Sequence, residues 1–186
     1  MLFKPCRRPI FLILLACFIL HGCSTGQSRV WVDEKVSFKD YKVFEVSPFF
    51  NATGGDLKGD ILTALTTLLR EELEGRDFQV VKPSQANTGV LIVRSSVLSY
   101  QGCRIIKGTA STGLATSGAA NTSTTTGQSM CTAQTQLIDK ATGRIVAKIF
   151  TTKVVGACFT DNFRDQWLLK ELAEDIAKKI AKIMKA

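Results

Sequence analysis

In this chain of 186 residues, the side chains most suited to covalent or metal chemistry are six cysteines and one histidine. Three of the cysteines and the histidine lie within the first 23 positions, as Cys6, Cys17, His21 and Cys23. The other three cysteines are separated by 28 and 27 residues, which matches no zinc-ligand pattern: Cys103, Cys131 and Cys158. The chemistry available therefore depends on whether the amino-terminal segment stays in the working protein.

That segment has the layout of a secretory signal peptide. Lys4, Arg7 and Arg8 precede an apolar run over residues 9–20. A helix needs roughly 20 apolar residues to cross a bilayer, so this run is too short for a secure membrane span. We expect residues 1–22 to be removed, although an uncleaved signal anchor remains the alternative.

The end of the run, Leu20-His21-Gly22-Cys23, resembles the lipobox of bacterial lipoproteins. The resemblance implies cleavage between Gly22 and Cys23, followed by acylation of Cys23 with fatty acids such as palmitate. Ser24 resembles the signal that sends such proteins to the outer membrane. The chain is thus expected to be anchored through its acyl chains at the periplasmic face of the outer membrane.

Loss of residues 1–22 removes His21, the one histidine in the chain. Enzymes with a Ser-His-Asp or Cys-His site are then excluded, since the nucleophile would lack its usual base. The glycine-rich stretch 113–118 has Walker-like spacing, but Ala119-Ala120 stands where lysine and Ser or Thr are required. We expect no enzymatic activity, no cofactor and no metal site.

The charge of the mature chain indicates which partners suit it. Cleavage would leave 21 of the 24 Lys and Arg residues against 16 Asp and Glu, a net charge of +5. This charge suits anionic lipid head groups or acidic glycans, although a solvated surface explains it equally well. The expected partners are the membrane and another envelope protein or glycan. Nucleic acid is not expected, and no oligomeric state is predicted.

Three cysteines in an oxidising compartment predict one disulfide and one spare thiol. If the two strands that flank the small-residue loop form a hairpin centred on that loop, residues whose numbers add up to roughly 234 face each other, and Cys103 and Cys131 are such a pair. A disulfide between them would close the base of the small-residue loop. A bridge from Cys131 to Cys158 is the alternative.

Hydrophobic periodicity predicts two helices and five main strands. Apolar residues recur at helical spacing over 57–74 and 161–185. Alternating patterns predict strands at 41–46, 78–81, 89–101, 130–139 and 144–155, with a shorter candidate at 30–32. Asp139 to Gly143 has the composition of a hairpin turn in which Gly143 takes a positive φ.

These elements predict an α+β fold, a two-layer α/β sandwich. A mixed sheet of about five strands would carry both amphipathic helices on one face, in the order strand, helix, four strands, helix. The first strand, helix and second strand would form a βαβ unit, and the later strands an antiparallel meander. We expect a signal peptide at 1–22, a lipidated tether at 23–29 and a single domain at 30–186. This domain carries a flexible small-residue loop at 107–129.

Residues 75–81, the glycine-rich stretch and the Asp-x-x-Thr-Gly hairpin at 137–146 together resemble a broad group of uncharacterised envelope lipoproteins. The fold of that group is similar to the amino-terminal domain of TolB and to the periplasmic domain of the curli secretion lipoprotein. The resemblance brings no catalytic residues and implies a protein-interaction or structural module. The element order also looks like that of a lipopolysaccharide-assembly lipoprotein. This second likeness implies an assembly or transport component that binds a barrel or an acidic glycolipid.

Overall fold

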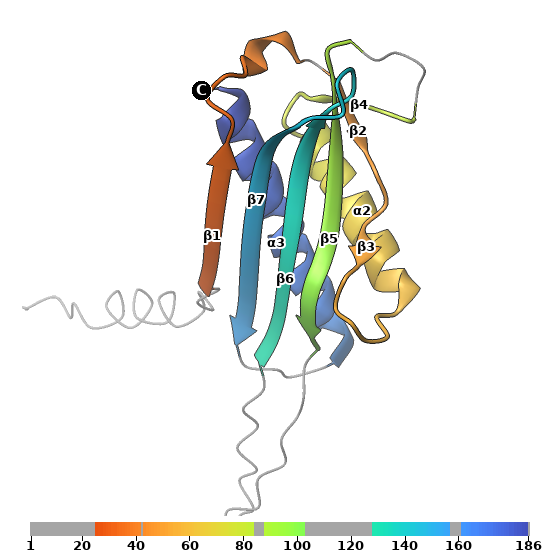
Figure 1. Ribbon diagram of the computed structural model, residues 1–186. Coiled ribbons are helices and arrows are strands. Elements are labelled where there is room, and N and C mark those ends of the chain that lie inside the picture. Colours follow the sequence, from red (N-terminus) through yellow and green to blue (C-terminus); the bar gives the residue numbers. More distant parts are fainter. Residues whose placement is uncertain (1–24, 42, 84–87, 103–127, 157–160, 186) are drawn as a thin grey trace, which may run out of the picture.

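The computed structural model describes residues 25–41, 43–83, 88–102, 128–156 and 161–185 (Figure 1). The predicted cleavage and acylation at Gly22 and Cys23 fall outside these residues, as do Cys103, Cys158 and most of the small-residue loop. Within the described ranges, no helix has both the length and the apolar character needed to cross a bilayer.

A seven-stranded mixed sheet forms the front layer of the molecule in Figure 1, in the order β1-β7-β6-β5-β2-β4, with the short β3 paired to β5. The predicted α+β class and mixed sheet are confirmed, and the sheet is larger than the five strands expected. The strands are β1 (Thr25–Val32), β2 (Val43–Val46), β3 (Phe50–Asn51), β4 (Gln79–Val81), β5 (Val90–Gln101), β6 (Gln128–Asp139) and β7 (Ile145–Gly156).

The pairing of the strands follows the predicted topology. β2 runs parallel to β4 and to β5, and the helix α2 (Gly59–Glu74) connects β2 and β3 to β4. β5, β6 and β7 form an antiparallel meander, and β1 adds to its outer edge antiparallel to β7. The parallel part of the sheet thus carries the crossover helix, and the antiparallel part is joined by turns and loops.

Both long helices, α2 and α3 (Asp161–Met184), cover the same face of the sheet, behind it in Figure 1. Each helix has apolar residues three or four positions apart, so each has one side to bury. These sides meet the inward-facing strand residues in one core. Its fully buried members include Leu65, Leu69 and Leu73 from α2, Leu168, Leu172, Ile176 and Ile180 from α3, and Val93, Val97, Leu137 and Ile149 from the sheet.

The turn between β6 and β7 confirms the predicted role of Gly143, whose φ is 68°. The Asp139 carboxylate accepts hydrogen bonds from the Ala141 backbone N–H (3.1 Å) and from the Thr142 hydroxyl (2.6 Å). The Asp-x-x-Thr-Gly sequence therefore closes the hairpin through its own side chains.

The predicted tether at 23–29 is too long, because β1 begins at Thr25 and pairs with β7 over its whole length. Residues 25–29 are small or polar, as the residues of a linker often are. They are compatible with a strand here because β1 is an edge strand with its outer face in solvent.

The predicted register of the β5–β6 hairpin is also wrong. Cys131 lies opposite Tyr100, three positions from the expected Cys103, and Met130 lies opposite Gln101. A register shift between Val97 and Ser99 moves the pairing one residue toward the predicted register, and the remaining difference lies in the pairing of the two strands themselves. Such a bulge places an extra residue on one strand, and the sequence pattern does not reveal it.

A buried threonine joins the β2–β3 segment to helix α2. The Phe49 backbone N–H donates a hydrogen bond to Thr66 Oγ1 (2.9 Å), and the Thr66 hydroxyl donates to the Leu62 carbonyl (2.7 Å). Phe49 and Thr66 are both buried. The threonine hydroxyl thus satisfies a buried backbone donor that has no strand partner of its own.

Replacing Thr66 with valine should lower the free energy of unfolding by about 1–3 kcal/mol, because the Phe49 N–H would stay buried without an acceptor. Urea denaturation measures this change. Thr63→Val is the matched control, since Thr63 bonds only the Gly59 carbonyl on the exposed side of the same helix. A Thr66→Val effect no larger than that of the control would contradict this role.

Candidate functional site

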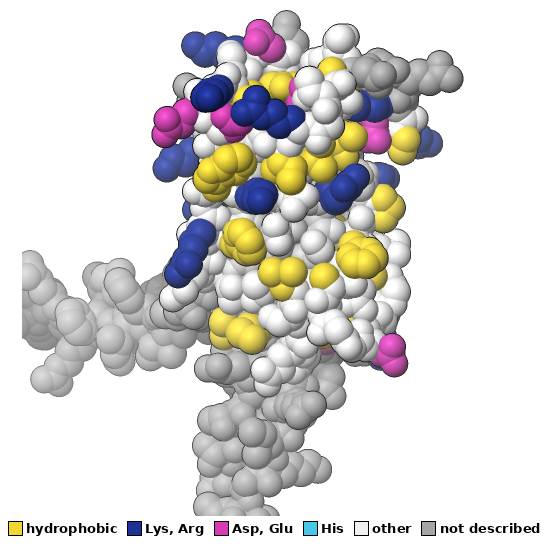
Figure 2. All heavy atoms as spheres, viewed as in Figure 1, with side chains coloured by type: hydrophobic (Ala, Val, Ile, Leu, Met, Phe, Trp, Pro, Cys, Tyr) yellow, Lys and Arg dark blue, Asp and Glu magenta, His cyan; other side chains and the backbone are white. Residues whose placement is uncertain are grey.

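No described helix or loop covers the face of the sheet opposite α2 and α3, and we call it the open face (Figure 2). Its residues alternate along each strand with the buried ones. On β7, Ala147, Ile149 and Thr151 are buried, and the residues between them point outward. The central residues of the open face are Gln27, Arg29 and Trp31 on β1, Lys148, Phe150 and Thr152 on β7, Thr132, Gln134 and Gln136 on β6, and Arg94 on β5.

Two aromatic residues and two cations alternate across β1 and β7 on this face. Trp31 lies opposite Lys148, and Arg29 lies opposite Phe150. The Lys148 ammonium is 5.9 Å from the centre of the Trp31 ring, within the range of a cation–π contact. Trp31 is 50% exposed and Phe150 40% exposed. Large aromatic rings with this much free surface are suited to stacking against a partner.

A shallow groove of about 330 Å³ lies beside these rings on the open face. Its walls are a guanidinium, an amide, a phenyl ring and two hydroxyls, from Arg29, Gln27, Phe150, Thr132 and Thr152. The two hydroxyls lie 3.1 Å apart and hydrogen-bond to each other across β6 and β7. The groove therefore combines one apolar wall with several hydrogen-bonding groups, a composition typical of a ligand site.

The central part of the open face is positively charged. Arg29, Arg94 and Lys148 form no ion pair with a carboxylate in the described part of the chain. Figure 2 shows acidic side chains only toward the rim of this face. On the covered face, by contrast, Lys153 lies 3.9 Å from both Glu171 and Asp175 of α3. The cations of the open face are thus available to an anionic partner.

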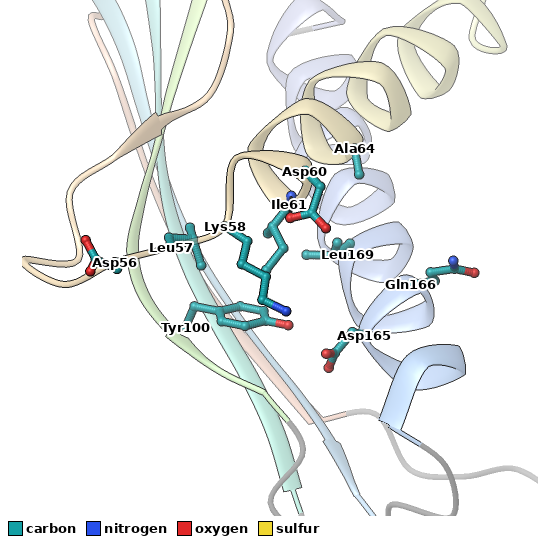
Figure 3. Close-up of a pocket in the computed structure, with 10 residues that line it drawn as sticks. All are labelled: Asp56, Leu57, Lys58, Asp60, Ile61, Ala64, Tyr100, Asp165, Gln166 and Leu169. Atoms are coloured by element: carbon teal, nitrogen blue, oxygen red, sulfur yellow. Dashed lines mark hydrogen bonds between the residues drawn. The ribbon is translucent and has the colours of Figure 1, made fainter.

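A second cavity, the end pocket, has a volume of about 660 Å³ and lies where α2 and α3 begin (Figure 3). The Tyr100 hydroxyl, the Lys58 ammonium and the Asp165 carboxylate turn toward this hollow. Within the described residues, the Tyr100 hydroxyl and Asp165 Oδ1 are buried without a hydrogen-bond partner. Burial is the main cause that raises the pKa of Tyr100, and the neighbouring Asp165 carboxylate adds to the shift. The tyrosine therefore stays protonated at physiological pH.

The polar groups of the end pocket do not form a recognisable reaction centre. Its charged lining residues are Asp56, Asp60, Asp165 and Lys58, and its other residues are Leu57, Ile61, Ala64, Tyr100, Gln166 and Leu169. This lining has no cysteine or serine that could act as a nucleophile. In the residues that the structure describes, no cluster of three or more His, Cys, Asp or Glu side chains could hold a metal ion.

Of the site residues predicted from the sequence, the structure describes only Cys131. Its side chain is fully buried on the covered face of β6, and it has no disulfide partner among the described residues, which do not include Cys103 or Cys158. Burial raises the pKa of its thiol to about 12. Because the thiolate is the reactive form, this cysteine is expected to be inert while the protein is folded.

The open face was not predicted from the sequence. Its signal was present in the alternation of 25–32 and 145–155, where Trp31 and Phe150 fall among outward-facing polar residues. Lone apolar residues at outward positions are common and need no functional explanation. Only the pairing of β1 with β7 shows that these two rings lie side by side with two cations.

Residue-resolved alkylation tests the state of Cys131. We expect iodoacetamide to leave Cys131 unmodified in the folded protein at pH 8, because its side chain is buried. Modification in denaturant without reductant would show that burial alone protects it. Mass spectrometry of peptides measures this labelling. If Cys131 stays blocked in denaturant until a reductant is added, a disulfide such as the predicted bridge to Cys103 protects it instead.

Comparisons with known proteins identify the fold. No family model and no curated protein matches the sequence. Among solved structures, the PelC dodecamer from Paraburkholderia phytofirmans is 12% identical, with 82% of this chain and 98% of that chain covered and a TM-score of 0.51. A DUF4136 family protein from Bacteroides thetaiotaomicron is 13% identical, with coverage of 86% and 97% and a TM-score of 0.46. Lipoprotein GNA1162 from Neisseria meningitidis is 11% identical, with coverage of 75% and 98% and a TM-score of 0.45. The likeness to PelC extends over nearly all of that chain and shows that the two share a fold.

Proposed function

We propose that the protein is a lipid-anchored lipoprotein of the bacterial outer membrane that acts as a non-enzymatic interaction module in the periplasm. The observation that carries this proposal is the lipobox at 20–23 directly before a strand of the folded domain. In the sequence, only Ser24 separates Cys23 from Thr25, the first residue of β1. An acylated Cys23 would hold that end of the domain close to the membrane.

The strand register supports a defined orientation for the anchored domain. Thr25 pairs with Val154 near the end of β7, and Gln128 at the start of β6 pairs with Gly156. Gln101, at the end of β5, pairs with Met130. The anchored end is therefore the end at which β5 and β7 finish and β6 begins. The remaining length of β1, at about 3.3 Å per residue, extends away from the anchor.

The described side chains support a binding role better than a catalytic one. The end pocket has no nucleophile paired with a base, whereas the open face presents exposed rings and unpaired cations. Exposed aromatic and arginine residues are the ones that most often dominate binding energy at protein surfaces.

The same cations favour a second candidate function. Arg29, Arg94 and Lys148 could contact the acidic groups of a glycolipid, as expected of an outer-membrane assembly or transport component. That role requires a barrel or another envelope component as a partner. Crosslinking in intact cells, followed by identification of the attached proteins, separates the two candidates.

Replacing Cys23 with alanine should abolish incorporation of radioactive palmitate and move the protein from the membrane pellet to the soluble fraction, because the proposed acylation site is lost. Fluorography and cell fractionation measure both effects. Cys17→Ala is the control, since it removes a cysteine from the same segment without touching the lipobox. Labelling that persists in the Cys23→Ala variant would rule out the proposed anchor.

A further inference from the structure

We propose that the open face binds an acidic polysaccharide whose sugar units carry carboxylates, with one unit seated in the groove formed by Gln27, Arg29, Thr132, Phe150 and Thr152. This inference rests on the proposed function in one respect, because a periplasmic location would expose the open face to the glycans of the cell envelope. The binding chemistry itself follows from the residues of the face.

The groove has the groups that a sugar ring requires. One side of a pyranose ring presents C–H groups, and its edge presents hydroxyls. The Phe150 ring, 40% exposed, provides an apolar surface for the C–H side. The Gln27 amide and the paired hydroxyls of Thr132 and Thr152 provide donors and acceptors for the edge. A purely electrostatic site would not need this combination.

The cations determine the charge of the partner. The Arg29 guanidinium lines the groove and can form two parallel hydrogen bonds to one carboxylate. Lys148 lies diagonally across β1 and β7 from Arg29. Diagonal neighbours on two antiparallel strands are about 7–8 Å apart. A second carboxylate of the same polymer could therefore meet Lys148 while the first remains on Arg29. Trp31, beside Lys148, offers a second ring for stacking.

The distribution of apolar side chains favours a glycan over a lipid surface. Gln134 and Gln136 of β6 and the two threonines border the exposed Phe150 ring, so the groove is a mixed polar and apolar surface and not the apolar one that enters a bilayer. The proposed anchor also lies at one end of β1, and most of the open face extends away from that end.

The test is binding of polygalacturonate to the full-length protein purified in detergent, measured by biolayer interferometry with neutral dextran as the reference polymer. We expect the Kd for polygalacturonate to rise by about tenfold or more in the Arg29→Gln, Lys148→Gln double variant, because two charge-assisted contacts are lost. Phe150→Ala should weaken binding by about fivefold or more through loss of stacking.

Lys170→Gln with Lys182→Gln is the matched control, because it removes the same charge from exposed positions of α3. Its Kd should stay within about twofold of the wild-type value if the contacts are local to the open face. Thermal unfolding of each variant checks that it is folded. Gln27→Glu provides a variant that keeps every cation and nearly the same side-chain size. It should also weaken binding, since it adds a negative charge to the groove.

Several results would overturn the inference. These are absence of polygalacturonate binding, equal weakening by the open-face and α3 double variants, and wild-type affinity in both Phe150→Ala and Gln27→Glu. Binding to phosphatidylglycerol vesicles that depends on Arg29 and Lys148, without binding to polygalacturonate, would identify a membrane surface as the partner instead. Because binding is measured on purified protein, it is independent of the Cys23 test. Glycan binding by a protein that is not acylated would contradict only the proposed anchor.

Discussion

The antiparallel pairing of β5, β6 and β7 determines which side chains of this protein are buried and which face outward. Successive residues of a strand point to opposite faces, so one register assigns every residue of the meander to the helix side or to the open side. Ile149 enters the core beneath α3, and its neighbours Lys148 and Phe150 face outward. A shift of one residue would exchange these roles and would place a lysine in the core.

The two faces of the sheet handle charge differently. On the covered face, Lys153 stands opposite Cys131 and would be costly to bury alone, but Glu171 and Asp175 of α3 both lie 3.9 Å from its ammonium. The contact fixes α3 against β7 by charge in addition to apolar packing. On the open face, the cations have no such partner among the described residues, so their charge is directed to solvent. This asymmetry distinguishes a structural lysine from lysines and arginines that can bind.

Periodicity predicted the helices and the meander because both depend on a repeating apolar pattern with one side to bury. The composition of the turn, and not periodicity, predicted the positive φ of Gly143, since glycine adopts that conformation without strain. Periodicity failed where pairing between distant segments decides the structure. β1 has no apolar inner row of its own over 25–29 and becomes a strand because β7 offers an edge. The bulge near Leu98 has no local signal, and it moved the hairpin register by one residue.

The candidate site was less predictable than the fold for the same reason. The groove takes Arg29 from β1, Phe150 from β7 and Thr132 from β6, and these residues are about 20 to 120 positions apart in the chain. Taken alone, each of these residues is of a type that is common on the solvent-exposed side of a strand. The end pocket likewise joins Tyr100 of β5 to Asp165 of α3, which no spacing in the sequence relates. The cysteines were the main candidate site residues in the sequence. The structure describes one of the three in the domain, Cys131, and its side chain is buried in the apolar core.

The attachment of β1 along the full length of β7 has a mechanical consequence. A pull from an acyl chain at Cys23 would enter the domain at Thr25 and act along the strand axis. The hydrogen bonds between antiparallel strands lie perpendicular to that axis, so the eight residue pairs of β1 and β7 would resist together and would not open one after another. The edge strand β1 is thus arranged to withstand tension that the proposed anchor would apply along its axis.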